Sequence, residues 1–127
     1  MKYYINLANK YDNIICNNDT ITIEPPVNAV GLSILCCSEW GKANDIIRIN
    51  FADNSSKRFS IYANDLPEYD LENSCLTGQT FDVNGTLIQE KAALTKSIFF
   101  FNKNKISSIQ LPICPNMHIV AMTILVD

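Results

Sequence analysis

The sequence predicts an all-β fold, a β-sandwich of jelly-roll-like topology with at most one short helix. Three observations support this prediction. Short apolar runs that alternate with polar residues recur along the chain, clusters of turn-forming residues separate them, and only one stretch has helical character. Strands punctuated by turns about every ten residues are typical of sandwiches and jelly rolls.

The composition is that of one globular domain spanning residues 1–127. Of the 127 residues 47% are apolar and 18% are charged, which provides a core and is too apolar for a disordered chain. The net charge of −3 argues against nucleic acid as a partner, because phosphate binding needs a basic face. The longest apolar run, residues 119–126, is too short to span a bilayer, so we expect no membrane partner.

Two strands are expected in the first third of the chain. Residues 21–23 alternate and are followed by Pro25-Pro26, which cannot donate to a β-ladder and so ends the strand or lies at a sheet edge. Residues 30–36 alternate again and form the next strand.

A β-hairpin follows. Ile47, Ile49 and Phe51 share one face of a strand, and residues 53–56 form a dense turn signal. Residues 58–62 then alternate as the returning strand.

The C-terminal third continues in the same style. Residues 98–101 are apolar throughout, as in a strand that is buried on both faces, and residues 102–105 form a turn. Residues 106–111 form a strand that leads into a proline, Pro115-Asn116 forms another turn, and residues 118–125 form the last strand.

One segment has helical character. Thr86 and Gln89 have the spacing of a capping box, and residues 90–94 are good helix formers, so this stretch forms either a short helical turn or no helix. The least regular part lies between residues 62 and 86, and loops of that length are often functional.

The cysteines predict a reducing environment. Their number is odd and no pair has C-x-x-C spacing, so we expect free, mostly buried thiols. The N-terminus has no apolar core of a signal peptide, which favours a cytoplasmic location, or an extracellular one if a leader has been lost. One histidine is too few for a usual zinc site, and the glycines form no phosphate loop, so we expect no metal and no cofactor.

Four segments carry a resemblance to a known family. A strand at residues 30–36 ends in Ser38-Glu39-Trp40-Gly41, and a second strand leads into the turn Phe51-Ala52-Asp53-Asn54-Ser55. Later come the strand end Ser108-Ile109-Gln110-Leu111-Pro112 and a final strand at residues 116–124. These segments resemble the galactose-binding-like accessory β-sandwich modules of bacterial glycoside hydrolases.

The resemblance covers residues 28–62 and 98–126. It departs from the family at Asn54, where a glycine is usual, and it transfers no calcium site. Members of the fold bind sugars or other polymers, bind partner domains, or only pack beside an enzyme. The resemblance therefore implies a bacterial, non-catalytic binding module, with carbohydrate as the expected ligand.

Five residues are candidates for ligand contact. Aromatic rings stack on the apolar faces of sugars, and carboxylates bind sugar hydroxyls. The candidates are Trp40, Glu39, Tyr62, Asp65 and Tyr69. Trp40 could instead cap the core, and the carboxylates of Asp65, Glu68 and Asp70 could instead be solvated or hold calcium.

Other function classes stay open beside this one. The free cysteines and the absent leader favour a structural or protein-interaction module, including one that is homo-oligomeric through a sheet face. A small enzyme would need His118 beside Cys36, Cys37 or Cys114, whereas a histidine in an apolar strand is more often structural. A cupin-type metal site would need several histidines.

Overall fold

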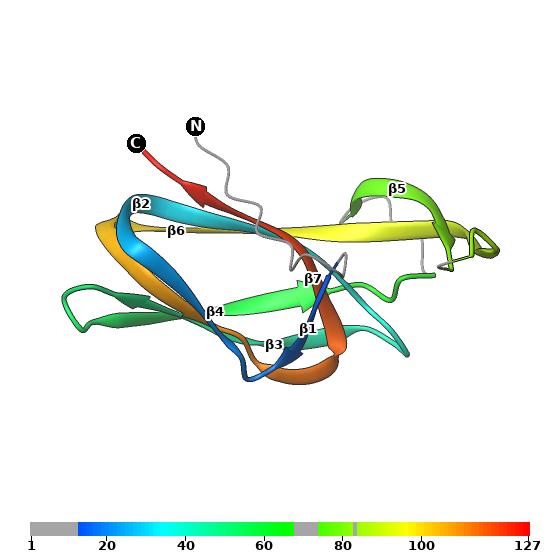
Figure 1. Ribbon diagram of the computed structural model, residues 1–127, viewed down its shortest axis with the longest axis horizontal. Helices are drawn as coiled ribbons and strands as arrows, with labels where there is room; N and C mark the ends of the chain where they lie inside the picture. The colour runs from blue at the N-terminus through cyan, green and yellow to red at the C-terminus, as the bar shows by residue number, and fades with distance from the viewer. Residues whose placement is uncertain (1–12, 68–73, 83) are drawn as a thin grey trace.

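The computed structural model describes residues 13–67, 74–82 and 84–127 (Figure 1). Within these ranges the secondary structure consists of strands, with no helix, which confirms the all-β prediction. The strands are β1 (Ile14–Asn17), β2 (Thr20–Ser38), β3 (Ala43–Phe51), β4 (Ser56–Ala63), β5 (Ser74–Phe81), β6 (Leu87–Gln110) and β7 (Ile113–Leu125).

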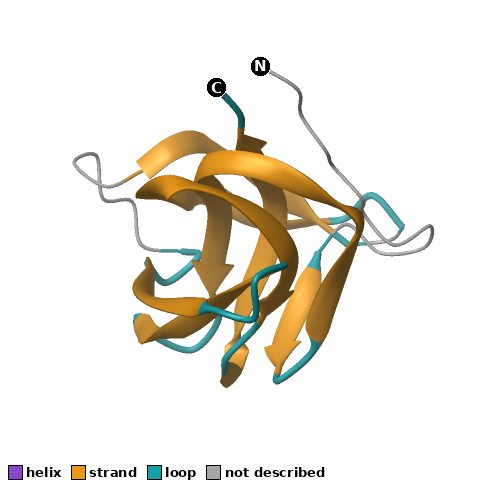
Figure 2. Ribbon diagram, turned by 90° about the vertical axis from the view of Figure 1, so that its left-hand side faces the viewer, coloured by secondary structure: helices purple, strands orange, loops and turns teal. Residues whose placement is uncertain are grey.

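The strands form one antiparallel sheet that curls around its own interior (Figure 2). The order is β1-β7-β2-β6-β3-β4, and β5 pairs with the first part of β6. The jelly-roll arrangement that the resemblance implies remains a prediction, because a single curled sheet does not by itself assign it.

Two long strands produce the curl. The first part of β2 pairs with residues 104–110 of β6, and the second part pairs with residues 95–100 of β6 and with β7. Register shifts between the two parts bend both strands, as β-bulges do. The sheet therefore folds over, and alternate side chains from its two halves meet inside.

The enclosed side chains form one core. Leu32 and Ile34 of β2 are fully buried, as the alternation predicted. Burying a side chain of this size contributes about 1.5–3 kcal/mol. The largest other fully buried side chains are Ile47, Ile49, Ile61, Ile106, Leu111, Met117 and Ile119.

The predicted hairpin is confirmed. β3 and β4 pair in continuous antiparallel register, and Ile47, Ile49 and Phe51 face the core. At the turn Asn54 has φ 65°, which asparagine tolerates. Hydrogen bonds from Ser55 and Asn104 to the Asp53 carboxylate favour its charged form and lower the pKa of Asp53 to about 2.

The short helix is not formed, because its segment belongs to β6. Asp82 accepts hydrogen bonds from the backbone amides of Asn84 and Thr86, both at 2.8 Å, and Gly85 has φ 82°. These contacts make a turn that joins β5 to β6 as a hairpin, so Thr86 does not cap a helix. Pairing with β5 outweighs the weak helix propensity of the following residues.

The predictions of two polar turns in the C-terminal third, at residues 102–105 and at Pro115-Asn116, are also wrong. Residues 102–105 continue β6, and their backbone pairs in part with β2. Pro115-Asn116 lies within β7. Polar residues occur both in turns and on the solvent-facing parts of long strands. Local composition therefore does not distinguish a turn from a strand at these two positions.

The apolar run at residues 98–101 is buried on one face only. Phe99 and Phe101 face the core, whereas Ile98 is 44% exposed and Phe100 is 71% exposed. Pro25-Pro26 lies inside β2, where pairing with β6 is interrupted between Thr22 and Val27. The structure thus agrees that this dipeptide cannot take part in the ladder.

Candidate binding sites

Trp40 projects into solvent from the loop that follows β2. Its side chain is 88% exposed, so it does not cap the core. Trp40 and Gly41 both have positive φ values, 66° and 113°. A left-handed conformation is unfavourable for a bulky residue by about 1–2 kcal/mol, so surrounding contacts have to hold this loop.

Those contacts come from both sides of the loop. The backbone amide of Ser38 donates to the carbonyl of Asn64 at 2.8 Å, and the amide of Leu66 donates to the carbonyl of Ser38 at 2.7 Å. On the other side the amide of Glu39 donates to the carbonyl of Asn116 at 2.8 Å. The loop is therefore anchored between two segments that are distant in sequence.

Glu39 is directed toward His118. Its Oε2 lies 3.7 Å from Nε2 of His118, and the Glu39 side chain is about half exposed. His118 Nδ1 lies 2.9 Å from Oδ1 of Asn13. The His118 side chain is only 13% exposed. Cys37 is its register partner on β2.

Asp65 and Tyr62 lie beside the base of the same loop. Asp65 forms a parallel bridge with Ser38, and its Oδ1 is buried without a hydrogen-bond partner in the described structure. The Tyr62 hydroxyl donates to Oδ1 of buried Asn64 at 2.5 Å. The structure therefore brings Asp65 to the Trp40 loop, while the Tyr62 hydroxyl is engaged in a structural contact.

The remaining predicted positions are not described. Tyr69, and the Glu68 and Asp70 carboxylates of the calcium alternative, lie outside the described residues. Across residues 13–67, 74–82 and 84–127, no three histidine, cysteine or acidic side chains gather to hold a metal ion.

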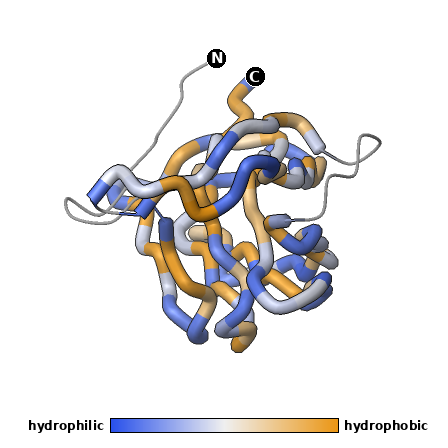
Figure 3. The backbone as a smooth tube through the Cα atoms, turned by 90° about the vertical axis from the view of Figure 1, so that its right-hand side faces the viewer, coloured by the Kyte–Doolittle hydropathy of each residue, from blue (hydrophilic) through white to orange (hydrophobic). Residues whose placement is uncertain are grey.

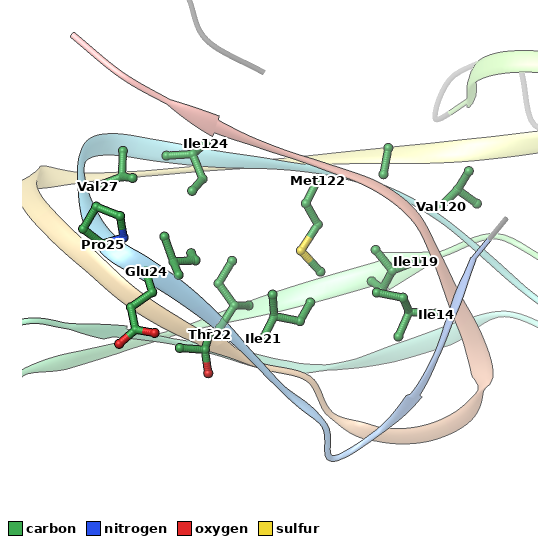
Figure 4. Close-up of a pocket in the computed structure, with 13 residues that line it drawn as sticks. Ile14, Ile21, Thr22, Glu24, Pro25, Val27, Ile119, Val120, Met122 and Ile124 are labelled. Atoms are coloured by element: carbon green, nitrogen blue, oxygen red, sulfur yellow. The ribbon is translucent and has the colours of Figure 1, made fainter. Parts of the chain in front are cut away.

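The sequence did not reveal an apolar pocket of about 350 Å³ on the open side of the curled sheet (Figure 4). The first part of β2 and the last part of β7 flank it, and Ile14 of β1 closes one end. Its volume falls in the range of roughly 300–1,000 Å³ that ligand sites occupy. The side chains that line it include Ile21, Ile23, Val27, Ile119, Met122 and Ile124.

The Cys16 and Cys36 thiols are not poised as nucleophiles. Cys16, Cys36 and Cys37 are buried, and none of the five cysteines forms a disulfide with another described residue. Burial raises the pKa of both the Cys16 and the Cys36 thiol to about 12, because the charged thiolate loses its hydration. Cys36 instead donates a hydrogen bond to the carbonyl of Tyr62 at 3.3 Å.

A scan against protein-family models finds no match, and a search of curated proteins finds no relative by sequence. The galactose-binding-like resemblance therefore remains a prediction. Within the described ranges no helix has the length and apolarity to cross a membrane.

Proposed function

We propose that this protein is a non-catalytic binding module that contacts carbohydrate through the Trp40 loop. The observation that carries the proposal is the 88% exposure of the Trp40 side chain. An indole ring held in water exposes a large apolar surface, and the apolar face of a sugar ring covers such a surface by stacking.

The surroundings of Trp40 support this proposal. Backbone hydrogen bonds to Asn64, Leu66 and Asn116 anchor the loop, so little conformational entropy is lost when a ligand binds. The carboxylates of Glu39 and Asp65 lie on or against the same loop and can accept hydrogen bonds from sugar hydroxyls. Of these two carboxylates, Glu39 is the more accessible acceptor, because its side chain is about half exposed whereas Oδ1 of Asp65 is buried.

Binding to a broad glycan panel tests the proposal, with Trp40→Ala as the test variant. We expect the variant to lose affinity by about thirtyfold, the effect of removing a central aromatic contact. Phe100→Ala is the matched control, because Phe100 is also an exposed aromatic residue but lies on β6. Glycan binding that survives in Trp40→Ala would rule out this site, and a folded protein that binds no glycan would rule out the ligand class.

A second candidate function is self-association through a sheet face. Phe100 and Ile98 of β6 point outward and lie in register with Gly31 and Ser33 of β2, and Leu125 of β7 is the other partner of Gly31. This apolar outer face favours an isologous contact between two copies. If so, sedimentation shows a concentration-dependent mass that Phe100→Ser lowers and Trp40→Ala leaves unchanged; a monomer at all concentrations contradicts it.

A further inference from the structure

The apolar pocket lies between two strand edges that have no strand partner in the described structure. β1 pairs with β7 only up to Ile119, so residues 120–125 of β7 have β2 on one side and no described strand on the other. Residues 20–22 and Val27 of β2 likewise pair with β6 on one side and with no described strand on the other. Figure 4 shows side chains from both strands pointing into the space between these edges.

The β7 edge lacks the features that usually protect an edge from pairing. Residues 120–125 contain no charge, no proline and no glycine. By contrast, the β4 edge carries Lys57 and Arg58, the β2 edge carries Pro25-Pro26, and β1 is only four residues long. Exposed edges of natural sheets are normally blocked by such features, so an unblocked apolar edge indicates a place where another strand adds.

The lining of the pocket determines which side chains an added strand must have in order to fit. A strand laid along β7 would direct every second side chain into the pocket, whose lining from Ile21, Ile23, Met122 and Ile124 is aliphatic. The other side chains would point away from the core. The fitting segment therefore has aliphatic residues at alternate positions, flanked by polar ones.

A negative charge on the protein indicates which kind of residue should lie at one end of the added strand. Among the described residues that line the pocket, Glu24 is the one that carries a charge, and it lies at the rim next to Pro25. Glu24 is exposed to solvent. A basic residue at the corresponding end of the added strand complements it.

We propose that this pocket and the β7 edge form an acceptor site for an extended strand of a partner protein, aliphatic at alternate positions and basic at the Glu24 end. The added strand completes the curled sheet through main-chain hydrogen bonds to residues 120–125. The site is separate from the Trp40 loop, so this inference does not depend on carbohydrate binding.

The test uses an acetylated synthetic peptide, Lys-Thr-Ile-Thr-Val-Thr-Ile-Thr, with binding measured by calorimetry. One control peptide has the same composition with its aliphatic residues placed consecutively. A second control has N-methyl groups at alternate residues, which remove main-chain donors and leave the apolar side chains in place. Amide hydrogen exchange of residues 120–125 is followed with and without the peptide.

We expect the alternating peptide to bind and to protect alternate amides among residues 120–125. Both control peptides should bind at least about tenfold more weakly, because each lacks either the apolar register or the main-chain hydrogen bonds. The Glu24→Gln variant should weaken binding of the lysine peptide about two- to fivefold and leave a peptide with threonine in place of lysine unaffected.

Three results would overturn the proposal. Equal binding of the N-methylated peptide would mean that the pocket takes apolar groups without strand pairing. Absence of binding, with amides 120–125 exchanging freely, would mean that the edge accepts no strand. Protection of these amides in the protein alone would mean that the chain or a second copy already occupies the edge.

Discussion

The turn between β3 and β4 depends on one residue that tolerates positive φ. Asn54 has φ 65°, and its amide donates to the carbonyl of Phe51 at 3.1 Å. We expect Asn54→Gly to change the free energy of unfolding by less than about 0.5 kcal/mol, and Asn54→Ala to lower it by about 1 kcal/mol, because alanine is strained there. Urea denaturation measures both, and an equal cost for the two variants would contradict this account.

Gly31 lies where two strands meet β2 at close range. A Cβ atom at this position would lie 2.6 Å from the carbonyl oxygen of Phe99 and 3.0 Å from Cδ1 of Leu125. Because the nearer atom belongs to the backbone, it cannot rotate away, and β6 would have to shift. We expect Gly31→Ala to lower the free energy of unfolding by about 2 kcal/mol.

Gly78 provides the matched control for that substitution. It lies within β5, and a Cβ there would meet no atom within 4 Å. Gly78→Ala should therefore be neutral or slightly stabilising, since alanine also restricts the unfolded chain. Thermal melts of the two variants compare them directly, and a similar loss in both would show that close approach is not the cause.

At the scale of elements, aromatic rings hold the β3–β4 hairpin against β6. The ring of Phe59 stacks on Phe99 at 5.0 Å and tilts against Phe101 at 6.3 Å between centroids. We expect Phe59→Ala to lower the free energy of unfolding by about 2–3 kcal/mol, less than for a fully buried phenylalanine, since Phe59 is partly exposed. Phe100→Ala, which removes an exposed ring from β6, should cost less than about 1 kcal/mol.

The elements that were predicted correctly from the sequence are those whose structure is determined by residues close together in the chain. The β3–β4 hairpin combines strict alternation at Ile47, Ile49 and Phe51 with a turn whose residues bond one another. The segment after Thr86 was ambiguous because its structure depends on β5, which pairs with it from outside the segment. Local propensity of a few tenths of a kcal/mol per residue cannot resist a paired neighbouring strand.

At the scale of the whole molecule, the candidate sites also divide into one with a local sequence signal and one that depends on distant segments. Trp40 could be singled out from the sequence because a lone tryptophan beside Glu39 and Gly41 at a strand end is a local feature. The apolar pocket could not, because Ile14, residues 21–27 and residues 119–124 are far apart in sequence and no local pattern links them. Figure 3 shows that hydrophobic segments are spread over much of the backbone, so hydropathy alone does not mark a pocket. Only the bend of β2 and β6 leaves these residues facing an opening.

Core burial of thiols makes the stability of the molecule sensitive to alkaline pH. The pKa of Cys36 rises from 9.0 to about 12, with burial as the main cause and nearby Cys37 as the next. Below pH 9 the thiol is protonated in both the folded and the unfolded chain. Between pH 9 and 12 the unfolded chain releases this proton and the folded chain keeps it, so the free energy of unfolding falls as pH rises.

Comparison with Cys36→Ala isolates this effect from other groups that titrate in the same range. Relative to the variant, the wild type should lose about 1.4 kcal/mol of unfolding free energy per pH unit above pH 9, measured by urea denaturation between pH 8 and 10.5. Cys75→Ala is the control, because Cys75 is already exposed in the folded protein and its removal relieves no burial. A wild-type curve that stays parallel to that of Cys36→Ala across this range would mean that the Cys36 thiol reaches water in the folded protein, and that the interior of the curled sheet is not closed around it.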